Sequence, residues 1–136
     1  MKTLLKDVET FQRDITGIEP AGSPTLVNAE YFMARADFMV EEINEFVESC
    51  MGGHIVGAAD ALADVVYVAV GTALSMGIPL DKVWDAVHAA NMKKQPGMTK
   101  RGIANDAVKP EGWVGPEKAI AAILAREIDG DQTFTG

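Results

Sequence analysis

Hydrophobic residues recur along most of the chain at steps of three and four positions, which is the period of an amphipathic α-helix. Glycine, proline or asparagine interrupts this pattern at intervals. The pattern predicts helices over residues 4–16, 29–50, 54–76 and 80–93, and a short final helix after Pro116 that ends in a frayed tail. No alternating pattern typical of strands competes with it, and no internal repeat is visible. The predicted fold class is therefore all-α, with four to five helices.

The segments between these helices carry strong turn signals. Two prolines and a glycine break residues 20–28, and Asn28 is expected to cap the helix that follows. Gly52 and Gly53 end that helix. Residues 95–115 hold several glycines and prolines without a sustained period, so this segment is expected to be an irregular loop. Loops of that length are usually functional or disordered.

Length and composition narrow the class of protein. A chain of 136 residues with 48% hydrophobic and 24% charged residues is expected to form one globular domain, residues 1–136. Its net charge of -8 disfavours binding to nucleic acid polymers. A single cysteine and no apparent signal peptide favour a cytoplasmic location. Residues 65–78 are apolar but shorter than the roughly 20 residues of a membrane span, so a buried helix is expected there.

Two glutamates on the second predicted helix, Glu42 and Glu45, lie one turn apart and share a face. Solvated surface is the common alternative for such a charged face. The expected core stripe of this helix consists of Phe32, Ala36, Met39, Ile43, Phe46 and Cys50. Because Tyr31, Arg35 and Phe38 lie on the side of the two glutamates, that side is expected to be partly enclosed.

Two aspartates on the third predicted helix, Asp60 and Asp64, are spaced four positions apart and are the only charged residues from position 55 to 80. On an apolar helix expected to be buried nearly all round, they need a partner or must be neutralised. A cap or a core hydrogen bond is the alternative. Four carboxylates from two adjacent helices suit Mg²⁺ or Mn²⁺. No histidine or cysteine cluster offers zinc ligands, and no Glu-x-x-His motif indicates a di-iron centre.

Basic residues concentrate near the end of the fourth predicted helix and in the loop that follows. Seventeen positions hold five of the twelve basic residues, namely Lys93, Lys94, Lys100, Arg101 and Lys109. Asn91 and Trp113 flank them with hydrogen-bonding and stacking groups that suit a nucleotide, although a solvated mobile loop is the alternative. Neither a P-loop nor a Gly-x-Gly-x-x-Gly motif is present, so phosphate would have to be held by these cations. Trp84 is expected in the core.

Four linked motifs resemble a known family. They are EEINEF at residues 41–46, DALADVVYV at 60–68, VHAANMKK at 87–94 and KPEGW at 109–113. In this order they resemble the MazG-like, all-α nucleoside triphosphate pyrophosphohydrolases, in the branch similar to phosphoribosyl-ATP pyrophosphohydrolase, over about residues 5–125. Many relatives have a glutamate three positions before the last aspartate, where this chain has Ala61, so the carry-over of a ligand role is weaker for Asp60 than for Asp64.

The resemblance implies a four-helix-bundle-like, oligomeric fold, as a homodimer or homotetramer. It implies Mg²⁺-dependent hydrolysis of a nucleoside triphosphate between the α- and β-phosphates, with Mn²⁺ able to substitute, and a purine deoxynucleotide such as dGTP is a plausible substrate. The implied metal ligands are Glu42, Glu45, Asp60 and Asp64, and the implied catalytic residues are Glu41, Glu42 and Glu45, with Glu41 orienting or deprotonating water. The implied substrate-binding residues are Arg35, Asn91, Lys93, Lys94, Arg101, Lys109 and Trp113. The alternatives are phosphoribosyl-ATP hydrolysis in histidine biosynthesis and a non-enzymatic, divalent-cation-binding helical dimer.

Overall fold

The computed structural model describes the backbone of residues 1–135 and the side chains of residues 1–128. It is mostly helical, which confirms the predicted all-α class. The chain forms two compact units, Met1–Leu80 and Asp81–Gly136. A single domain over the whole chain stays a prediction.

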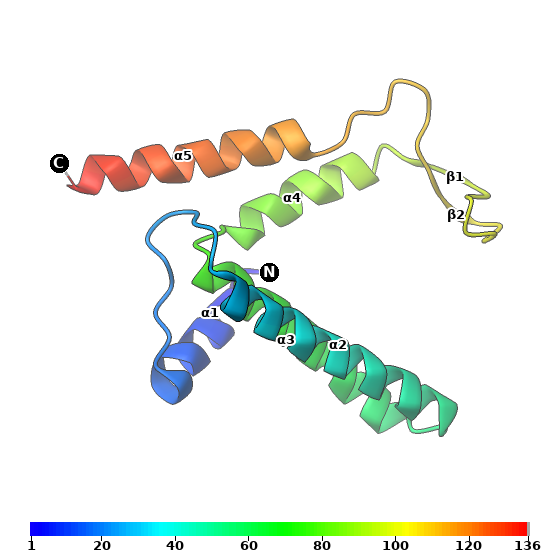
Figure 1. Ribbon diagram of the computed structural model, residues 1–136. Helices are drawn as coiled ribbons and strands as arrows, with labels where there is room; N and C mark the ends of the chain where they lie inside the picture. Colours follow the sequence, from blue (N-terminus) through cyan, green and yellow to red (C-terminus); the bar gives the residue numbers. More distant parts are fainter. Residues whose placement is uncertain (136) are drawn as a thin grey trace. The chain divides into compact units, whose positions relative to one another are not determined.

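The first unit is built on a helical hairpin (Figure 1). Helix α2 and helix α3 run antiparallel, side by side, and the first helix packs on α3. The elements are α1 (Lys2–Phe11), a π-helical turn η1 (Gln12–Thr16), α2 (Ala29–Met51) and α3 (Ile55–Ser75). These bounds agree with the predicted helices to within a few residues.

Local signals explain where α2 begins and how the loop before it is held. Asn28 Oδ1 accepts a hydrogen bond of 2.9 Å from the backbone N–H of Tyr31, which confirms the predicted cap. Further back in this loop, the Thr25 N–H donates to the Met76 carbonyl at 2.8 Å. Gly77, at a φ of 66°, lies against the Ser23 carbonyl where a Cβ would collide with it. Glycine is therefore required at the position where the loop crosses the end of α3.

The core stripe expected on α2 is wrong for most of its residues. Phe32 and Ile43 are 47% and 48% exposed. Ala36 and Cys50 are also exposed, and Met39 and Phe46 are half-buried. The side that faces α3 instead carries Tyr31, whose hydroxyl donates to Ser75 Oγ at 2.6 Å. Polar groups on α3 thus select the polar side of α2 as the packing face, and the apolar stripe stays on the surface.

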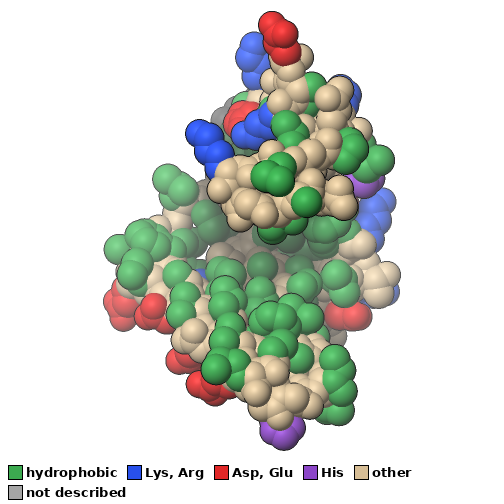
Figure 2. All heavy atoms as spheres, turned by 90° about the vertical axis from the view of Figure 1, so that its right-hand side faces the viewer, with side chains coloured by type: hydrophobic (Ala, Val, Ile, Leu, Met, Phe, Trp, Pro, Cys, Tyr) green, Lys and Arg blue, Asp and Glu red, His purple; other side chains and the backbone are tan. Residues whose placement is uncertain are grey.

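Helix α3 buries only its small residues along most of its length. Its buried residues are Ala58, Ala61, Val70, Gly71 and Ala73. Its large side chains near the turn are exposed: Ile55 by 80%, Val56 by 81% and Leu62 by 53%. The prediction that α3 is buried on nearly all sides is therefore wrong for a single copy of the chain. Figure 2 shows hydrophobic side chains spread over the surface around the α2–α3 turn.

Helix α3 begins ten residues before the apolar stretch 65–78 and is longer than that stretch. By length and composition alone, the 21-residue α3 is long and apolar enough to cross a membrane, and it is the one such helix among the described residues. This evidence is weak, because a core helix of a soluble protein passes the same test.

The second unit holds two helices and a small hairpin. Its elements are α4 (Leu80–Asn91), β1 (Gln95–Gly97), β2 (Asp106–Val108) and α5 (Glu117–Thr135). Helices α4 and α5 are joined by an ion pair in which Lys82 Nζ lies 2.6 Å from Glu127 Oε1. The strands pair antiparallel, with Gln95 opposite Val108 and Gly97 opposite Asp106.

Three expectations for the second unit are wrong. Residues 95–115 contain two strands, which at three residues each are too short to show an alternating pattern. Helix α5 continues to Thr135 where a frayed tail was expected, and Gly136 lies outside the described residues. Trp84 is 55% exposed and not part of a core.

Candidate active site

The α2–α3 hairpin brings the four predicted carboxylates into one electrostatic neighbourhood. Burial raises the pKa of Glu42 above its ordinary value, and a hydrogen bond with Glu45 raises this pKa further. The negative charges of Glu45, Asp64 and Asp60 act on Glu42 in the same direction. The charges of the other three side chains therefore act on Glu42, whereas the role of the four as metal ligands stays a prediction.

Glu42 is the most constrained member of this acidic cluster, which we define as Glu42, Glu45, Asp60 and Asp64. Its Oε2 atom is buried and has no hydrogen-bond partner among the described residues. Glu42 and Asp64 are half-buried, whereas Glu45 and Asp60 are exposed. A buried carboxylate oxygen without a donor is unfavourable, and a cation is a suitable partner for it.

The cluster is not a closed metal site as it stands. Within residues 1–128, whose side chains are described, no three histidine, cysteine, aspartate or glutamate side chains lie close enough to hold one metal ion. The donor set itself, four carboxylates with one orphaned buried oxygen, fits Mg²⁺ or Mn²⁺.

Glu41 lies beside the cluster and not within it. Its side chain is exposed, and it is not among the groups that raise the pKa of Glu42. A role for Glu41 in orienting or deprotonating water stays a prediction.

Arg35 connects α2 to α3, two helical turns before Glu42. Its Nε donates to Thr72 Oγ1 and its Nη2 donates to the Val68 carbonyl, both at 2.9 Å. Its guanidinium also lies 6.0 Å from the ring centre of Tyr31 and 5.8 Å from that of Phe38. Arg35 therefore has a structural role between the helices, and its predicted role in substrate binding stays a prediction.

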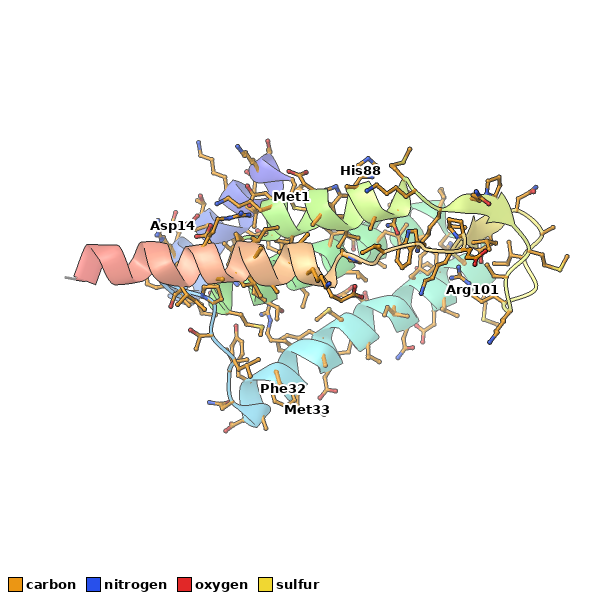
Figure 3. The ribbon with its side chains drawn as sticks, turned by 90° about the horizontal axis from the view of Figure 1, so that it is seen from above. Met1, Asp14, Phe32, Met33, His88 and Arg101 are labelled. Carbon is orange, nitrogen blue, oxygen red and sulfur yellow. The ribbon has the colours of Figure 1, made fainter. Side chains whose placement is uncertain are left out.

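In the second unit, the β1–β2 hairpin encloses a basic hollow of about 630 Å³. Its lining residues are Lys94, Met98, Thr99, Lys100, Arg101, Ala107, Val108 and Lys109. Figure 3 shows Arg101 at this hairpin. Four cations thus surround one hollow, an arrangement that suits an anionic group such as a phosphate.

The ring of Trp113 lies close to the ammonium groups of two of these cations. Its indole Nε1 donates to the carbonyl of Ala90, at the end of α4, at 2.8 Å. Lys94 Nζ lies 5.1 Å and Lys109 Nζ lies 5.0 Å from the ring centre, within the range of cation–π attraction. The structure therefore brings together three of the predicted substrate-binding residues. Asn91 and Lys93 are exposed around the end of α4.

The hairpin contains functional candidates that sequence reasoning missed. Asp106 accepts a hydrogen bond from Thr99 Oγ1 and forms an ion pair with Arg101, both at 2.6 Å. The hydrogen bond from Thr99 is the largest cause that lowers the pKa of Asp106. Arg101 is thus paired with a carboxylate and not only available to a ligand. No signal in the sequence indicates this pairing, because it depends on the strand register.

Comparison with known proteins identifies a related family. A family model described as phosphoribosyl-ATP pyrophosphohydrolase matches residues 8–91, which is more than half of the chain. The matched span contains the whole acidic cluster and ends at Asn91, before the basic hairpin. A search of curated proteins finds no match.

Proposed function

The chain belongs to the phosphoribosyl-ATP pyrophosphohydrolase family and is a nucleotide pyrophosphohydrolase of the MazG-like superfamily, and on that premise we propose that it hydrolyses a nucleoside triphosphate between the α- and β-phosphates. The products are a nucleoside monophosphate and pyrophosphate. The observation that supports this reaction most directly is the acidic cluster around Glu42, with its raised pKa and its unpartnered oxygen. Membership in a hydrolase family and the presence of a basic hairpin both disfavour the alternative of a non-enzymatic, cation-binding dimer.

In this proposal the acidic cluster holds one or more divalent cations. Bound Mg²⁺ or Mn²⁺ would offset the charge of the triphosphate and lower the pKa of an attacking water. Glu42 and Asp64, as the half-buried members, are the primary ligands, and Glu45 and Asp60 complete the set. Glu41 accepts the proton of the water, whose oxygen forms a bond to the α-phosphorus while the bond to the bridging oxygen breaks and pyrophosphate leaves.

The basic hairpin binds the phosphate chain. Lys94 and Lys109 are held near Trp113, and Lys93 and Arg101 add charge from the adjacent turn and strand loop. In this proposal Asn91, at the end of α4, contacts the sugar or base. Within the second unit, the cations of the hairpin are the groups suited to the negative charge of phosphate.

We expect Lys109→Ala to lower kcat/KM for a nucleoside triphosphate by one to two decades. The variant removes a charge-assisted contact with phosphate, which contributes about 1.5 to 3 kcal/mol. Pyrophosphate release under steady-state conditions measures the effect. The matched control is Lys118→Ala, an exposed lysine on α5. Equal kinetics for the two variants would show that Lys109 does not bind the phosphates.

A purine deoxynucleotide such as dGTP is the proposed substrate. A panel of the common ribo- and deoxynucleoside triphosphates, with phosphoribosyl-ATP included, tests this by measuring pyrophosphate release with Mg²⁺ and with Mn²⁺. We expect the highest kcat/KM for a purine deoxynucleotide. A clear preference for phosphoribosyl-ATP would overturn the proposed substrate while leaving the reaction type intact.

The exposed apolar stripes of the hairpin support a homodimer or homotetramer. Phe32, Val40, Ile43 and Val47 on α2 are each between 46% and 53% exposed, together with large side chains on α3. Figure 3 shows Phe32 at the start of α2. Such contiguous apolar surface is typical of an interface between subunits.

We therefore expect at least a dimer in sedimentation at micromolar concentration. Ile43→Glu should shift the protein toward monomer, because it places a charge within the apolar stripe. The matched control is Leu26→Glu in the loop before α2, where the side chain is 88% exposed. A folded, active monomer of the unaltered protein at that concentration would contradict the oligomer.

A further inference from the structure

The carboxylate of Asp106, the first residue of β2, joins the loop between the two strands to the strand itself. Its Oδ2 atom accepts a hydrogen bond from Thr99 Oγ1 and pairs with Arg101 Nη2, both at 2.6 Å. Its Oδ1 atom accepts a hydrogen bond of 2.8 Å from the backbone N–H of Ala107. One side chain therefore binds two separate residues of the loop.

The backbone of the hairpin brings these two residues to the carboxylate. The Gly102 N–H donates to the Thr99 carbonyl at 3.0 Å, which closes a tight turn around Arg101. Gly102 has a φ of 78°, in the left-handed region that glycine adopts without strain. Asp106 lies opposite Gly97 in the strand pairing, directly beside this turn. The turn and the strand register thus fix the arrangement together.

The ion pair leaves part of the Arg101 guanidinium available to a ligand. The side chain of Arg101 is 70% exposed, whereas that of Asp106 is 14% exposed. Among the contacts of the described side chains, Arg101 uses Nη2 alone of its three guanidinium nitrogens. A guanidinium can bind two acceptor groups at once through its fork of N–H donors. Arg101 also lines the basic hollow, so its remaining donors are suited to an anion there.

By charge alone, Asp106 disfavours an anion at this hairpin. Its negative charge offsets one of the four cations that line the basic hollow. A carboxylate at this position assists phosphate binding only if the order that it imposes on Arg101 outweighs the charge that it removes. A long side chain that is held in advance loses less conformational entropy on binding. The two effects of Asp106 on affinity therefore have opposite signs, which makes them separable by experiment.

We propose that Asp106 is a positioning residue that holds the guanidinium of Arg101 at the basic hollow, where its free donors bind the oxygens of a polyphosphate chain. The inference rests on the proposed function and adds to it the residue that orders the phosphate-binding hairpin before the substrate binds. The hydroxyl of Thr99 supports the same carboxylate. Asp106 itself does not touch the substrate.

The test is the affinity for inorganic triphosphate, measured by calorimetric titration in buffer freed of divalent metal ions. Under these conditions the acidic cluster cannot bind phosphate through a metal ion. We expect Asp106→Asn to weaken binding by roughly 3- to 10-fold, the effect of freeing one long side chain, although the variant removes a negative charge. Tighter binding, as charge alone predicts, would overturn the proposal, and so would the absence of triphosphate binding by the unaltered protein.

A double-mutant cycle separates positioning from a general structural role. In an Arg101→Ala background, Asp106→Asn should no longer weaken binding, because the group that Asp106 positions is gone. Thr99→Val removes the supporting hydroxyl at nearly constant volume and should weaken binding by a smaller factor, again only when Arg101 is present. This second variant keeps the test available where Asp106→Asn does not fold. A loss of affinity that persists unchanged without Arg101 would overturn the proposal.

The matched control is Asp85→Asn. Asp85 is an exposed carboxylate on α4 in the same unit, so its neutralisation should leave the affinity for triphosphate nearly unchanged. An equal loss of affinity in Asp85→Asn and Asp106→Asn would assign the effect to overall charge and contradict the positioning role.

Hydrolysis kinetics keep this inference distinguishable from the proposed reaction. In Asp106→Asn we expect KM for a nucleoside triphosphate to rise by more than kcat falls, because Asp106 acts through binding. If the titrations give the expected pattern and no nucleoside triphosphate releases pyrophosphate, the positioning role holds and the proposed reaction is wrong. If hydrolysis is observed and the effect of Asp106→Asn on triphosphate binding does not depend on Arg101, the positioning role alone is wrong.

Discussion

Replacing Asp64 by Asn should reduce pyrophosphate release by at least about 100-fold while leaving the helical fold intact. Asparagine has nearly the volume of aspartate but lacks its charge, so the acidic cluster loses a proposed metal ligand without losing packing. Asp64 is half-buried on α3 and is one of the charges that act on Glu42. Steady-state kinetics with Mg²⁺ measures the loss, and circular dichroism with thermal melting reports the fold.

The control for this experiment is Asp37→Asn. Asp37 is an exposed carboxylate on α2, and it is not among the groups that raise the pKa of Glu42, so its neutralisation should leave turnover nearly unchanged. Turnover that persists in Asp64→Asn, or in the unaltered protein with excess EDTA, would show that the acidic cluster does not act through a metal ion.

Replacing Glu42 by Gln should abolish turnover and at the same time stabilise the metal-free protein. The pKa of Glu42 is raised by burial and by the neighbouring carboxylates, so its charged form is unfavourable in the folded state. Glutamine removes that charge and keeps the shape of the side chain. We expect a higher melting temperature in EDTA together with a loss of activity of at least about 100-fold.

The raised pKa of Glu42 determines whether its contribution to the free energy of unfolding grows or falls with pH. The folded state binds the proton of Glu42 more tightly than the unfolded chain does. The contribution of Glu42 to the free energy of unfolding is therefore present at pH values below its ordinary pKa and is lost as the pH rises through the raised pKa. Glu42→Gln should remove this component of the pH profile in EDTA.

Two comparisons make the Glu42 result decisive. Glu48→Gln, an exposed neighbour on α2, should change neither the melting temperature nor its pH dependence appreciably. Mg²⁺ should raise the melting temperature of the unaltered protein by binding the folded state, and should do so much less for Glu42→Gln. A Glu42→Gln variant that is less stable than the unaltered protein in EDTA would contradict the unfavourable burial of this charge.

The helices could be predicted from the sequence because their signals are local. A three- and four-residue period, with Asn28 at one end and Gly52–Gly53 at the other, places helix α2 within one residue of its observed bounds. The spacing of Glu42 with Glu45 and of Asp60 with Asp64 likewise depends only on helical geometry. Once two such helices are joined by a short turn, an acidic cluster between them is a direct expectation.

The packing face of α2 was decided by tertiary structure. Two stripes on this helix are compatible with burial, one with Phe32 and Ile43 and one with Tyr31, Arg35 and Glu42. The helical period does not choose between them, because both repeat at the same spacing. The choice depends on hydrogen-bonding partners that α3 presents at Val68, Thr72 and Ser75, far away in sequence.

Dependence on distant partners also explains which other features could be predicted from the sequence and which could not. The sequence determined the all-α class, the acidic pairs and the concentration of basic residues after α4, since each is a property of neighbouring positions. Only the tertiary structure paired Arg101 with Asp106, placed Lys94 and Lys109 near Trp113, and buried Gln12 beside Gly71. These contacts depend on strand register and on close backbone approach. Both are set by the packing of the whole chain and not by the preferences of any local segment.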